Sequence, residues 1–165
     1  MERRELRKKL HLSGMDSRAA ELAKQRGLGF EITEFCWVPR LEQPDAMALV
    51  RRQIEGVRHL WLHAPFAELS PCSIDPLVRA TALHRFRQAI ETAQALGVTR
   101  LVVHGGFIPL VYFPEWFVEQ SVLFWRELLV DVPEGMVLAA ENVMEPGPEM
   151  LVQIAGQVND PRLGL

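Results

Sequence analysis

The sequence contains very little cysteine. Cys36 and Cys72 are the only two among 165 residues, and they form no C-x-x-C pair. This excludes a disulfide-rich scaffold and a zinc site built from cysteines. The chain has no run of about 18 apolar residues, which a transmembrane helix requires. The amino-terminal MERRELRKK is not followed by the apolar segment of a signal peptide. We therefore expect a cytoplasmic protein with no membrane contact.

An excess of positive charge is also missing. The chain has 18 Lys and Arg residues against 21 Asp and Glu residues, which gives a net charge of −3. Proteins that bind nucleic acid usually carry a basic excess or stripe, so this balance disfavours a nucleic-acid partner. The glycine-rich motifs G-x-G-x-x-G and G-x-x-x-x-G-K-[ST] are both absent, so no motif supports nucleotide binding.

The composition is that of an ordinary globular domain, with 48% hydrophobic and 24% charged residues. A chain of this length buries enough surface for one core. It is short for a closed (β/α)8 barrel, which typically needs about 250 residues.

Strand-like and helix-like segments alternate along the chain. The predicted strands are residues 9–13, 29–35, 60–63, 100–104, 136–143 and 162–165. The first predicted helix is capped by Asp16 or Ser17 and extends to Arg26, and the others cover 45–57, 76–96, 114–130 and 148–158. The third helix has the clearest ends, because Asp75 is a good N-cap, Pro76 suits the first turn and Gly97 stops the helix. This order predicts βαβ units and a parallel sheet in a single α/β domain over residues 1–165.

The strands alternate between apolar and polar positions, and successive side chains of a strand point to opposite faces. One face carries Leu10, Leu12, Phe30, Ile32, Leu60, Leu62, Leu101, Val103, Leu138 and Ala140. The other carries His11, Ser13, Glu31, Thr33, Trp61, His63, Val102, His104, Ala139 and Glu141. An open doubly wound sheet buries both faces and shows continuous apolar runs. The pattern instead predicts a barrel, here a partial (β/α)8 TIM barrel of about five and a half βα units.

Three of the polar residues, His63, His104 and Glu141, stand at the ends of three consecutive strands on the same face. Two imidazoles and a carboxylate suit Zn²⁺, Mn²⁺ or a similar divalent ion. Each histidine taken alone is more simply explained as a core residue with satisfied hydrogen bonds. Their common register favours a site.

Three further residues on this face are candidates for substrate binding. Glu31 either contacts substrate from the second strand or is a buried carboxylate paired with His11 or an arginine. Trp61 either floors a sugar pocket or fills a layer inside the barrel, and His11 shares its face. The loop 107–113 is more apolar than a solvated loop needs to be, which predicts a cover over a pocket or a contact surface.

Several short motifs resemble those of one family. They are LHAPF at 62–66, LG at 96–97, VVHGG at 102–106 and AENV at 140–143, with KLHLS at 9–13 and the segment 27–35 matching the first two units. In this order and spacing, the chain from Lys9 onward resembles the xylose isomerase-like TIM-barrel superfamily of sugar isomerases, epimerases and endonuclease IV proteins. Gly105 is a departure, because the family more often has proline after this histidine.

The resemblance implies a metal-dependent isomerase or epimerase acting on a small sugar-like hydroxy-carbonyl compound, with proton transfer next to the carbonyl through an enediolate. Glu141 would be a metal ligand in either branch, and a catalytic acid/base in the isomerases and epimerases. His63 and His104 would be zinc ligands in the endonuclease branch and would line the substrate pocket in the epimerase branch. The expected cofactor is Mn²⁺ or Zn²⁺, with Mg²⁺ and Co²⁺ as further options. The alternative activity is that of a zinc-dependent abasic-site endonuclease.

The resemblance also implies further ligands on strands six to eight, which would follow Leu165. We therefore expect an incomplete barrel whose metal shell lacks these later residues, and one interpretation is that this form is inactive for that reason. A third alternative is a non-catalytic half-barrel that associates with another chain or forms a homo-oligomer through its open sheet edges.

Overall fold

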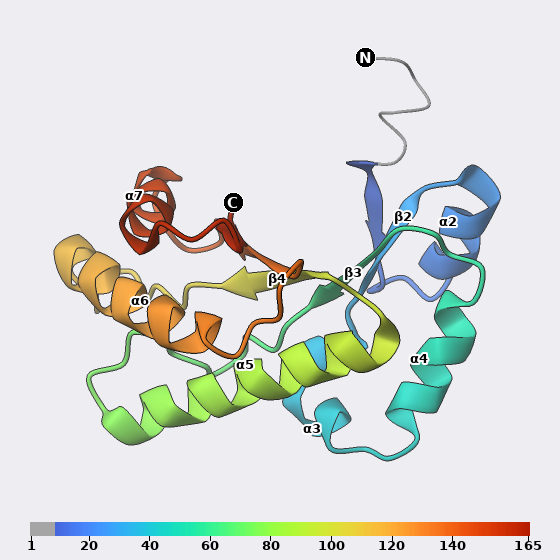
Figure 1. Cartoon of the computed structure of the whole chain (residues 1–165), viewed down its shortest axis with the longest axis horizontal. Helices are drawn as coiled ribbons and strands as arrows, with labels where there is room; N and C mark the ends of the chain where they lie inside the picture. Colours follow the sequence, from blue (N-terminus) through green and yellow to red (C-terminus); the bar gives the residue numbers. More distant parts are fainter. Residues whose placement is uncertain (1–8) are drawn as a thin grey trace.

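Six parallel strands form one sheet in the computed structural model, which describes residues 9–165 (Figure 1). They are β1 (His11–Ser13), β2 (Gly29–Ile32), β3 (Leu60–His63), β4 (Arg100–His104), β5 (Val137–Glu141) and β6 (Leu163–Gly164). The strand order is β1-β2-β3-β4-β5-β6, so each strand pairs with its neighbours in sequence. The predicted parallel α/β architecture is confirmed. Within the described residues β1 and β6 form the two edges, and the sheet does not close into a barrel.

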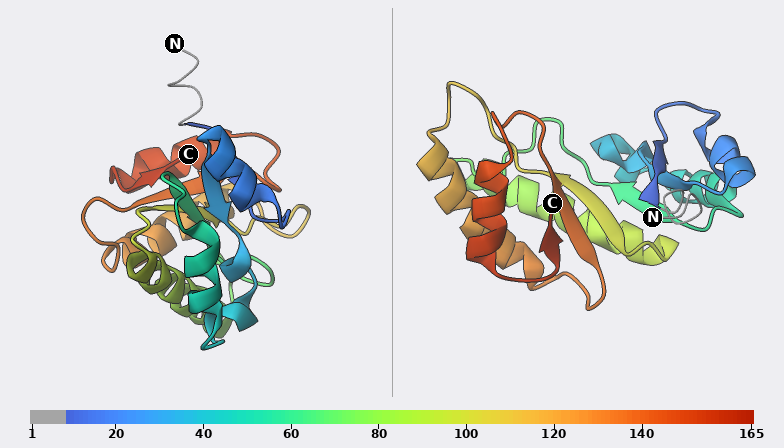
Figure 2. Two further views of the ribbon diagram at one scale, coloured as in Figure 1. Left: turned by 90° about the vertical axis from the view of Figure 1, so that its right-hand side faces the viewer. Right: turned by 90° about the horizontal axis from the view of Figure 1, so that it is seen from above.

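The helices follow one another along the sheet, from α2 through α4, α5 and α6 to α7 (Figures 1 and 2). They are α2 (Ala19–Arg26), α3 (Val38–Leu41), α4 (Ala46–Ile54), α5 (Pro76–Leu96), α6 (Pro114–Leu129) and α7 (Glu149–Val158), with a 3-10 helix η1 (Glu34–Cys36) after β2. None of the helices in this part of the chain is long and apolar enough to cross a membrane.

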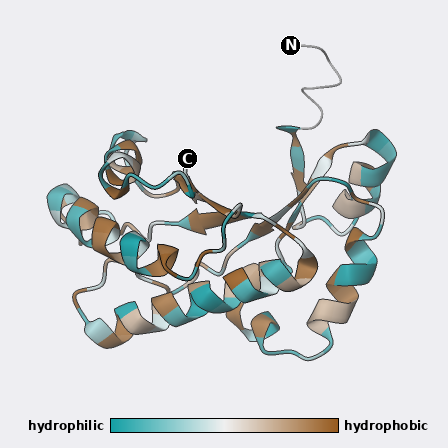
Figure 3. Cartoon of the chain, viewed as in Figure 1, coloured by the Kyte–Doolittle hydropathy of each residue, from teal (hydrophilic) through white to brown (hydrophobic). Residues whose placement is uncertain are grey.

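The apolar face of the strands forms the core, together with the inner sides of the helices. Its strand residues are buried: Phe30, Ile32, Leu62, Leu101, Val103, Leu138, Ala140 and Leu163. In Figure 3 the strands are mostly apolar, and apolar and polar residues alternate along the helices. Leu10 is an exception, because it precedes β1 and is 50% exposed. Leu10 therefore does not belong to the buried apolar face of the sheet, where its alternation placed it.

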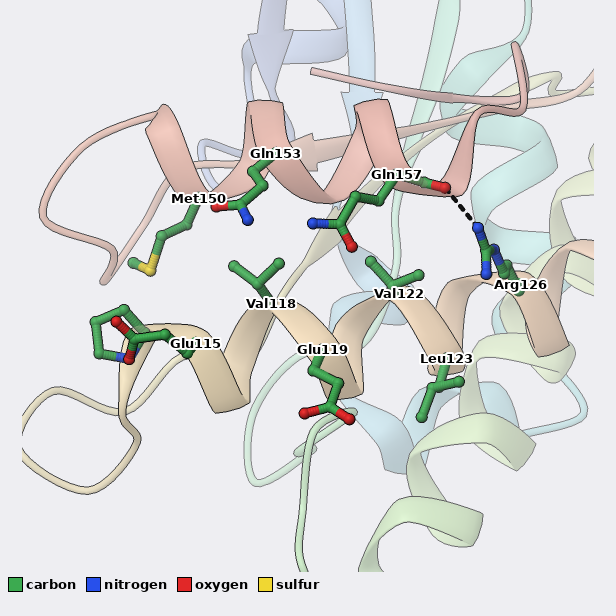
Figure 4. A pocket seen from close by; sticks show the side chains of 10 residues that line it. Glu115, Val118, Glu119, Val122, Leu123, Arg126, Met150, Gln153 and Gln157 are labelled. Carbon is green, nitrogen blue, oxygen red and sulfur yellow. Dashed lines mark hydrogen bonds between the residues drawn. The ribbon is translucent and has the colours of Figure 1, made fainter.

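Helix α6 is buried on more than one side because it packs against both α5 and α7. Phe124 and Trp125 are almost fully buried, and their rings lie 5.7 and 5.6 Å from the ring of Phe86 on α5. On the α7 side, Arg126 Nη2 donates to the carbonyl oxygen of Gln157 at 2.6 Å (Figure 4). This double packing explains the apolar residues around most of the helix.

Helix ends with clear capping chemistry lie where the sequence predicts them. Asp75 Oδ1 accepts from the backbone N–H of Leu77 at 2.8 Å, and Gly97 ends α5 with a φ of 70°. The start of α2 differs: Asp16 bonds to the backbone N–H of Arg18 in a turn, and the helix begins only at Ala19.

The chain also leaves β2 earlier than its β-rich sequence suggests. Strand β2 ends at Ile32, and Thr33 precedes η1, so Thr33 does not share a strand face with Glu31. The short helix α3 contains Pro39 and has only four residues, which is too short for helical periodicity to reveal.

Candidate metal centre

Three side chains meet where β3, β4 and β5 end. His63, His104 and Glu141 are the last residues of these strands. His104 pairs directly with Glu141, and His63 pairs with Val102, two residues before His104. A spacing of two residues keeps side chains on the same face of a sheet. The register therefore brings all three to one place, on the face opposite the helical core.

The donor atoms of the three residues converge on one another. His104 Nε2 lies 3.0 Å from Glu141 Oε2, and His63 Nε2 lies 3.5 Å from the same oxygen. All three donor atoms lie within 4.8 Å of one another. His63 is buried, whereas the side chain of Glu141 is 51% exposed. The group therefore has a protected side and a side that a small molecule can reach.

The backbone fixes which nitrogen of His63 faces this group. His63 Nδ1 lies 2.7 Å from the carbonyl oxygen of Ala64. A carbonyl oxygen only accepts, so Nδ1 carries the proton and donates it. The lone pair of the neutral ring is then on Nε2, which is directed at Glu141. A histidine held in this way is oriented as a metal ligand is.

The surroundings of His104 favour the neutral ring. Burial lowers the pKa of His104, and the nearby His63 lowers it further, whereas the hydrogen bond to Glu141 opposes the shift. Neutral imidazole is the form that binds a metal ion, because protonation removes the lone pair. The pKa shift therefore acts in the direction that metal binding needs.

The spacing of these donors fits a divalent ion. Ligand atoms at about 2.0–2.1 Å from a tetrahedral zinc ion lie roughly 3.4 Å apart. The two distances to Glu141 Oε2, 3.0 and 3.5 Å, bracket that separation. Two imidazoles with one carboxylate also match the donor types that zinc and manganese accept. His63, His104 and Glu141 could thus hold one ion together without a large movement of the backbone.

Phe66 covers the two histidines. Its ring centroid lies 4.5 Å from that of His104 and 5.3 Å from that of His63. An apolar ring at this position limits the access of water to the imidazoles and strengthens electrostatic interactions there. The motif at 62–66 contains Phe66, but no periodicity identifies a loop residue as part of a site, so sequence reasoning did not single it out.

The three predicted substrate-binding residues lie beside this group on β1, β2 and β3. The His11 ring is 5.2 Å from that of Trp61, so the tryptophan packs against a side chain of the same face. Among residues 9–165, His11 Nε2 has no hydrogen-bond partner, so the proposed pairing with Glu31 is not found. Burial raises the pKa of Glu31, while the neighbouring His63 lowers it and Glu141 raises it. Glu31 therefore lies within electrostatic reach of the triad.

Two loops beyond β3 and β4 are joined by hydrogen bonds. Ser70 Oγ and the Tyr112 hydroxyl lie 2.7 Å apart, and just after the second loop Trp116 Nε1, in the first turn of α6, donates to the carbonyl oxygen of Cys72 at 3.3 Å. The loops touch closely at Gly106, where φ is +75° and an added Cβ would lie 2.7 Å from Pro71. Ser73 Oγ accepts from the backbone N–H of Asp75, and Asp75 caps α5 as its sequence predicts.

Gly105 departs from the family pattern for a steric reason. An added Cβ would lie 2.9 Å from the ring of Phe117 and 3.1 Å from Glu145 Oε1. Glu145 is buried, and its Oε2 accepts from the backbone N–H groups of Val143 and Met144 at 2.9 and 3.1 Å. Sequence reasoning missed Glu145, because its role depends on a turn geometry that no spacing reveals.

The two joined loops and the loop after β5 line an open cavity of about 420 Å³ next to His104. Its lining residues are Phe66, Ala67, Glu68, Leu69, Ser70, His104, Gly105, Gly106, Phe107, Ile108, Val143, Met144 and Glu145. The apolar loop that starts at Phe107 thus contributes to a pocket, as its composition predicts. A groove of about 390 Å³ between α6 and α7 has no histidine and lies in the helical layer (Figure 4). Of these two hollows, the one with metal-ligand chemistry is at the strand ends.

Comparison with known proteins places this geometry in a family. The model of the xylose isomerase-like TIM barrel matches residues 20–165. A protein of Thermus thermophilus, whose structure was determined after soaking with zinc chloride, is 30% identical, with a TM-score of 0.66 over 94% of this chain and 63% of its own. A D-tagatose 3-epimerase-like protein is 22% identical, with a TM-score of 0.75 over 94% of this chain and 63% of its own.

One curated relative, the probable endonuclease 4 of Ureaplasma urealyticum, is 26% identical over 110 residues, which are 67% of this chain and 36% of the relative. The chain thus spans only part of the length of its relatives. It covers 39% and 36% of two curated relatives and 63% of each of the two solved structures. The family match covers most of the sequence, and the six-stranded parallel sheet agrees with it. The chain belongs to the xylose isomerase-like TIM-barrel family.

Proposed function

We propose that this chain carries the metal centre of a sugar isomerase or epimerase, an enzyme that moves a proton on the carbon next to a carbonyl group. The observation that carries the proposal is the meeting of His63 Nε2, His104 Nε2 and Glu141 Oε2 at the ends of three strands. The ends of barrel strands are where enzymes of this architecture place their catalytic groups. The zinc-soaked relative from Thermus thermophilus supports a divalent ion as the cofactor.

The three residues would hold the ion, and Glu141 would also transfer the proton. A divalent ion at this position would supply Lewis-acid stabilisation of charge on the substrate oxygens. Glu141 is half exposed, so a substrate can approach its carboxylate. We assign to it the removal and return of the proton on the carbon next to the carbonyl. His63 and His104 orient this carboxylate from the buried side, and Phe66 limits water around them.

A zinc-dependent endonuclease is the second candidate, favoured by the similarity to the probable endonuclease 4. Phosphate contacts from lysine and arginine supply most of the affinity of proteins for DNA. The residues that line the cavity beside His104 include neither lysine nor arginine, and two of them are glutamates. The net charge of −3 also disfavours binding to the negatively charged DNA backbone. These features support the isomerase or epimerase over the endonuclease.

The test is proton exchange at carbon in deuterated water. The protein, loaded with Mn²⁺ or Zn²⁺, is incubated with a panel of ketoses, and deuterium at the carbon next to the carbonyl is measured by NMR. Removing the acid/base group in Glu141→Gln lowers the exchange rate by about 10²–10⁴-fold. Glu119→Gln, an exposed residue on α6, is the matched control and keeps the wild-type rate.

Two outcomes would contradict this function. Absence of exchange over the whole panel with either ion would reject the isomerase or epimerase. Cleavage of a duplex with an abasic site, lost in Glu141→Gln and retained in Glu119→Gln, would establish the endonuclease instead.

A further inference from the structure

We propose that the cavity beside His104 receives an apolar, uncharged part of the substrate and rejects a phosphate group. This inference rests on the proposed function, because it assumes that the hydroxy-carbonyl end of the same molecule meets the triad. His104 belongs both to the triad and to the lining of the cavity. One small molecule can therefore reach the two at once. The volume of about 420 Å³ lies within the range of small-molecule sites, about 300–1,000 Å³.

The walls of the cavity are apolar side chains that remain exposed to solvent. Phe66 is 40% exposed, Ile108 45%, Val143 46% and Met144 57%. They come from three different loops, after β3, β4 and β5, and face the same hollow. Covering them with an apolar group removes this surface from water, which contributes about 25 cal/mol per Å². A fully hydroxylated sugar end would gain little of this energy.

The charge of the cavity opposes an anion. The lining has no lysine, arginine, asparagine or glutamine, and it contains the carboxylates of Glu68 and Glu145. Backbone N–H groups at a loop can bind phosphate, but those of Val143 and Met144 already donate to Glu145 Oε2. A phosphate here would meet two negative charges and would find these donors occupied. Repulsion between like charges in a partly buried site is large enough to decide which substrates bind.

The experiment uses three compounds with the same HOCH₂–CO head and different remaining groups. They are 2-hydroxyacetophenone, with a phenyl group, dihydroxyacetone, with a hydroxymethyl group, and dihydroxyacetone phosphate. Binding to the zinc-loaded protein is measured by calorimetry, and contact with the phenyl protons by saturation-transfer NMR. We expect the phenyl compound to bind about tenfold or more tightly than dihydroxyacetone, and the phosphate compound to bind most weakly.

Two variants of one loop test whether the cavity sets this preference. Ile108→Lys places a cation in the lining and is expected to reverse the order in favour of the phosphate compound. Leu110→Lys adds the same charge two residues away, at a fully exposed side chain outside the lining, and is expected to leave the order unchanged.

The inference is overturned if wild type binds the phosphate compound as tightly as the phenyl compound, if both lysine variants change the order equally, or if none of the three compounds binds. These outcomes are distinct from failure of the proposed function, which is measured by deuterium exchange with ketoses and its loss in Glu141→Gln. If deuterium exchange is observed but the three compounds do not bind in the expected order, only the assignment of the cavity is rejected.

Discussion

The two halves of the polar sheet face differ in how their side chains meet. On β3, β4 and β5 the donor atoms of three residues converge within 4.8 Å, and the exposed Glu141 links both histidines. On β1 and β2 the same alternation brings His11 and Glu31 to the same face, but His11 packs against the Trp61 ring, and its Nε2 has no partner within residues 9–165. Polar residues on the same face of neighbouring strands are therefore not sufficient to form a metal site.

The contrast comes from position along the strands. The triad stands at the last residue of each strand, where the chain turns away and leaves room for a ligand. His11 is the first residue of β1, and its ring lies over Gly29, which has no side chain to obstruct it. Groups at strand ends therefore reach the loops, whereas His11 and Glu31 lie earlier in their strands and are half-buried.

Zinc affinity is the strongest test of this contrast. His104→Ala removes one of three donors and should lower the affinity for Zn²⁺ by about 100-fold or more, because even outer partners of metal ligands contribute about 10–100-fold. His11→Ala removes an imidazole from the same sheet face and should leave the affinity unchanged. Competition with a fluorescent chelator measures both. Equal losses in the two variants would show that the halves of the face do not differ in this way.

Two glycines allow a smaller comparison. Alanine at Gly105 would contact the buried Phe117 ring and Glu145, and alanine at Gly29 would overlap the His11 ring. Each change should destabilise the fold by about 1–3 kcal/mol, as overpacking usually does. Only Gly105→Ala should also weaken zinc binding, because this residue follows His104 directly. Thermal unfolding and the chelator competition together separate the two effects, and a loss of zinc affinity in Gly29→Ala would contradict the separation.

The smallest effect concerns Glu31 and pH. Burial raises the pKa of this carboxyl group, so the folded protein holds the proton more tightly than the unfolded chain. Its contribution to stability is present below the ordinary pKa and falls as the pH rises through the raised value. Without metal, Glu31→Gln should therefore raise the melting temperature slightly at pH 7 and have little effect at pH 4.

The exposed Glu91→Gln on α5 serves as the matched control for Glu31→Gln. Glu91→Gln should change the melting temperature equally at pH 7 and at pH 4. A Glu31→Gln variant that is less stable than wild type at pH 7 would show that the carboxylate is stabilising, contrary to the direction of its pKa shift.

The sequence predicted those features that depend on local chemistry. The ends of α5 follow from the Asp75 cap and from Gly97, and the shared face of the triad follows from the two-residue alternation of short strands. The distances within the triad do not follow from alternation, because they depend on the register between strands. Phe66 and Glu145 reach the site through loop geometry, for which the sequence has no period.

The errors have similar causes. Four residues around Pro39 form α3 without a detectable pattern, and β2 ends before the β-rich segment does because Glu34–Cys36 turns into a 3-10 helix. In both places the tertiary context overrides the local preference of the residues. The expectation for α2 failed for a related reason, since Asp16 closes a turn instead of capping the helix.

The sequential order of the strands has a consequence for folding kinetics. Every strand pairs with the strands next to it in the chain, so each pairing closes only the loop of one βα unit, and the chain entropy lost at each step stays small. His104 and Glu141, for example, are separated by 37 positions. A nascent chain can add one unit at a time, and the triad is complete as soon as β5 docks on β4.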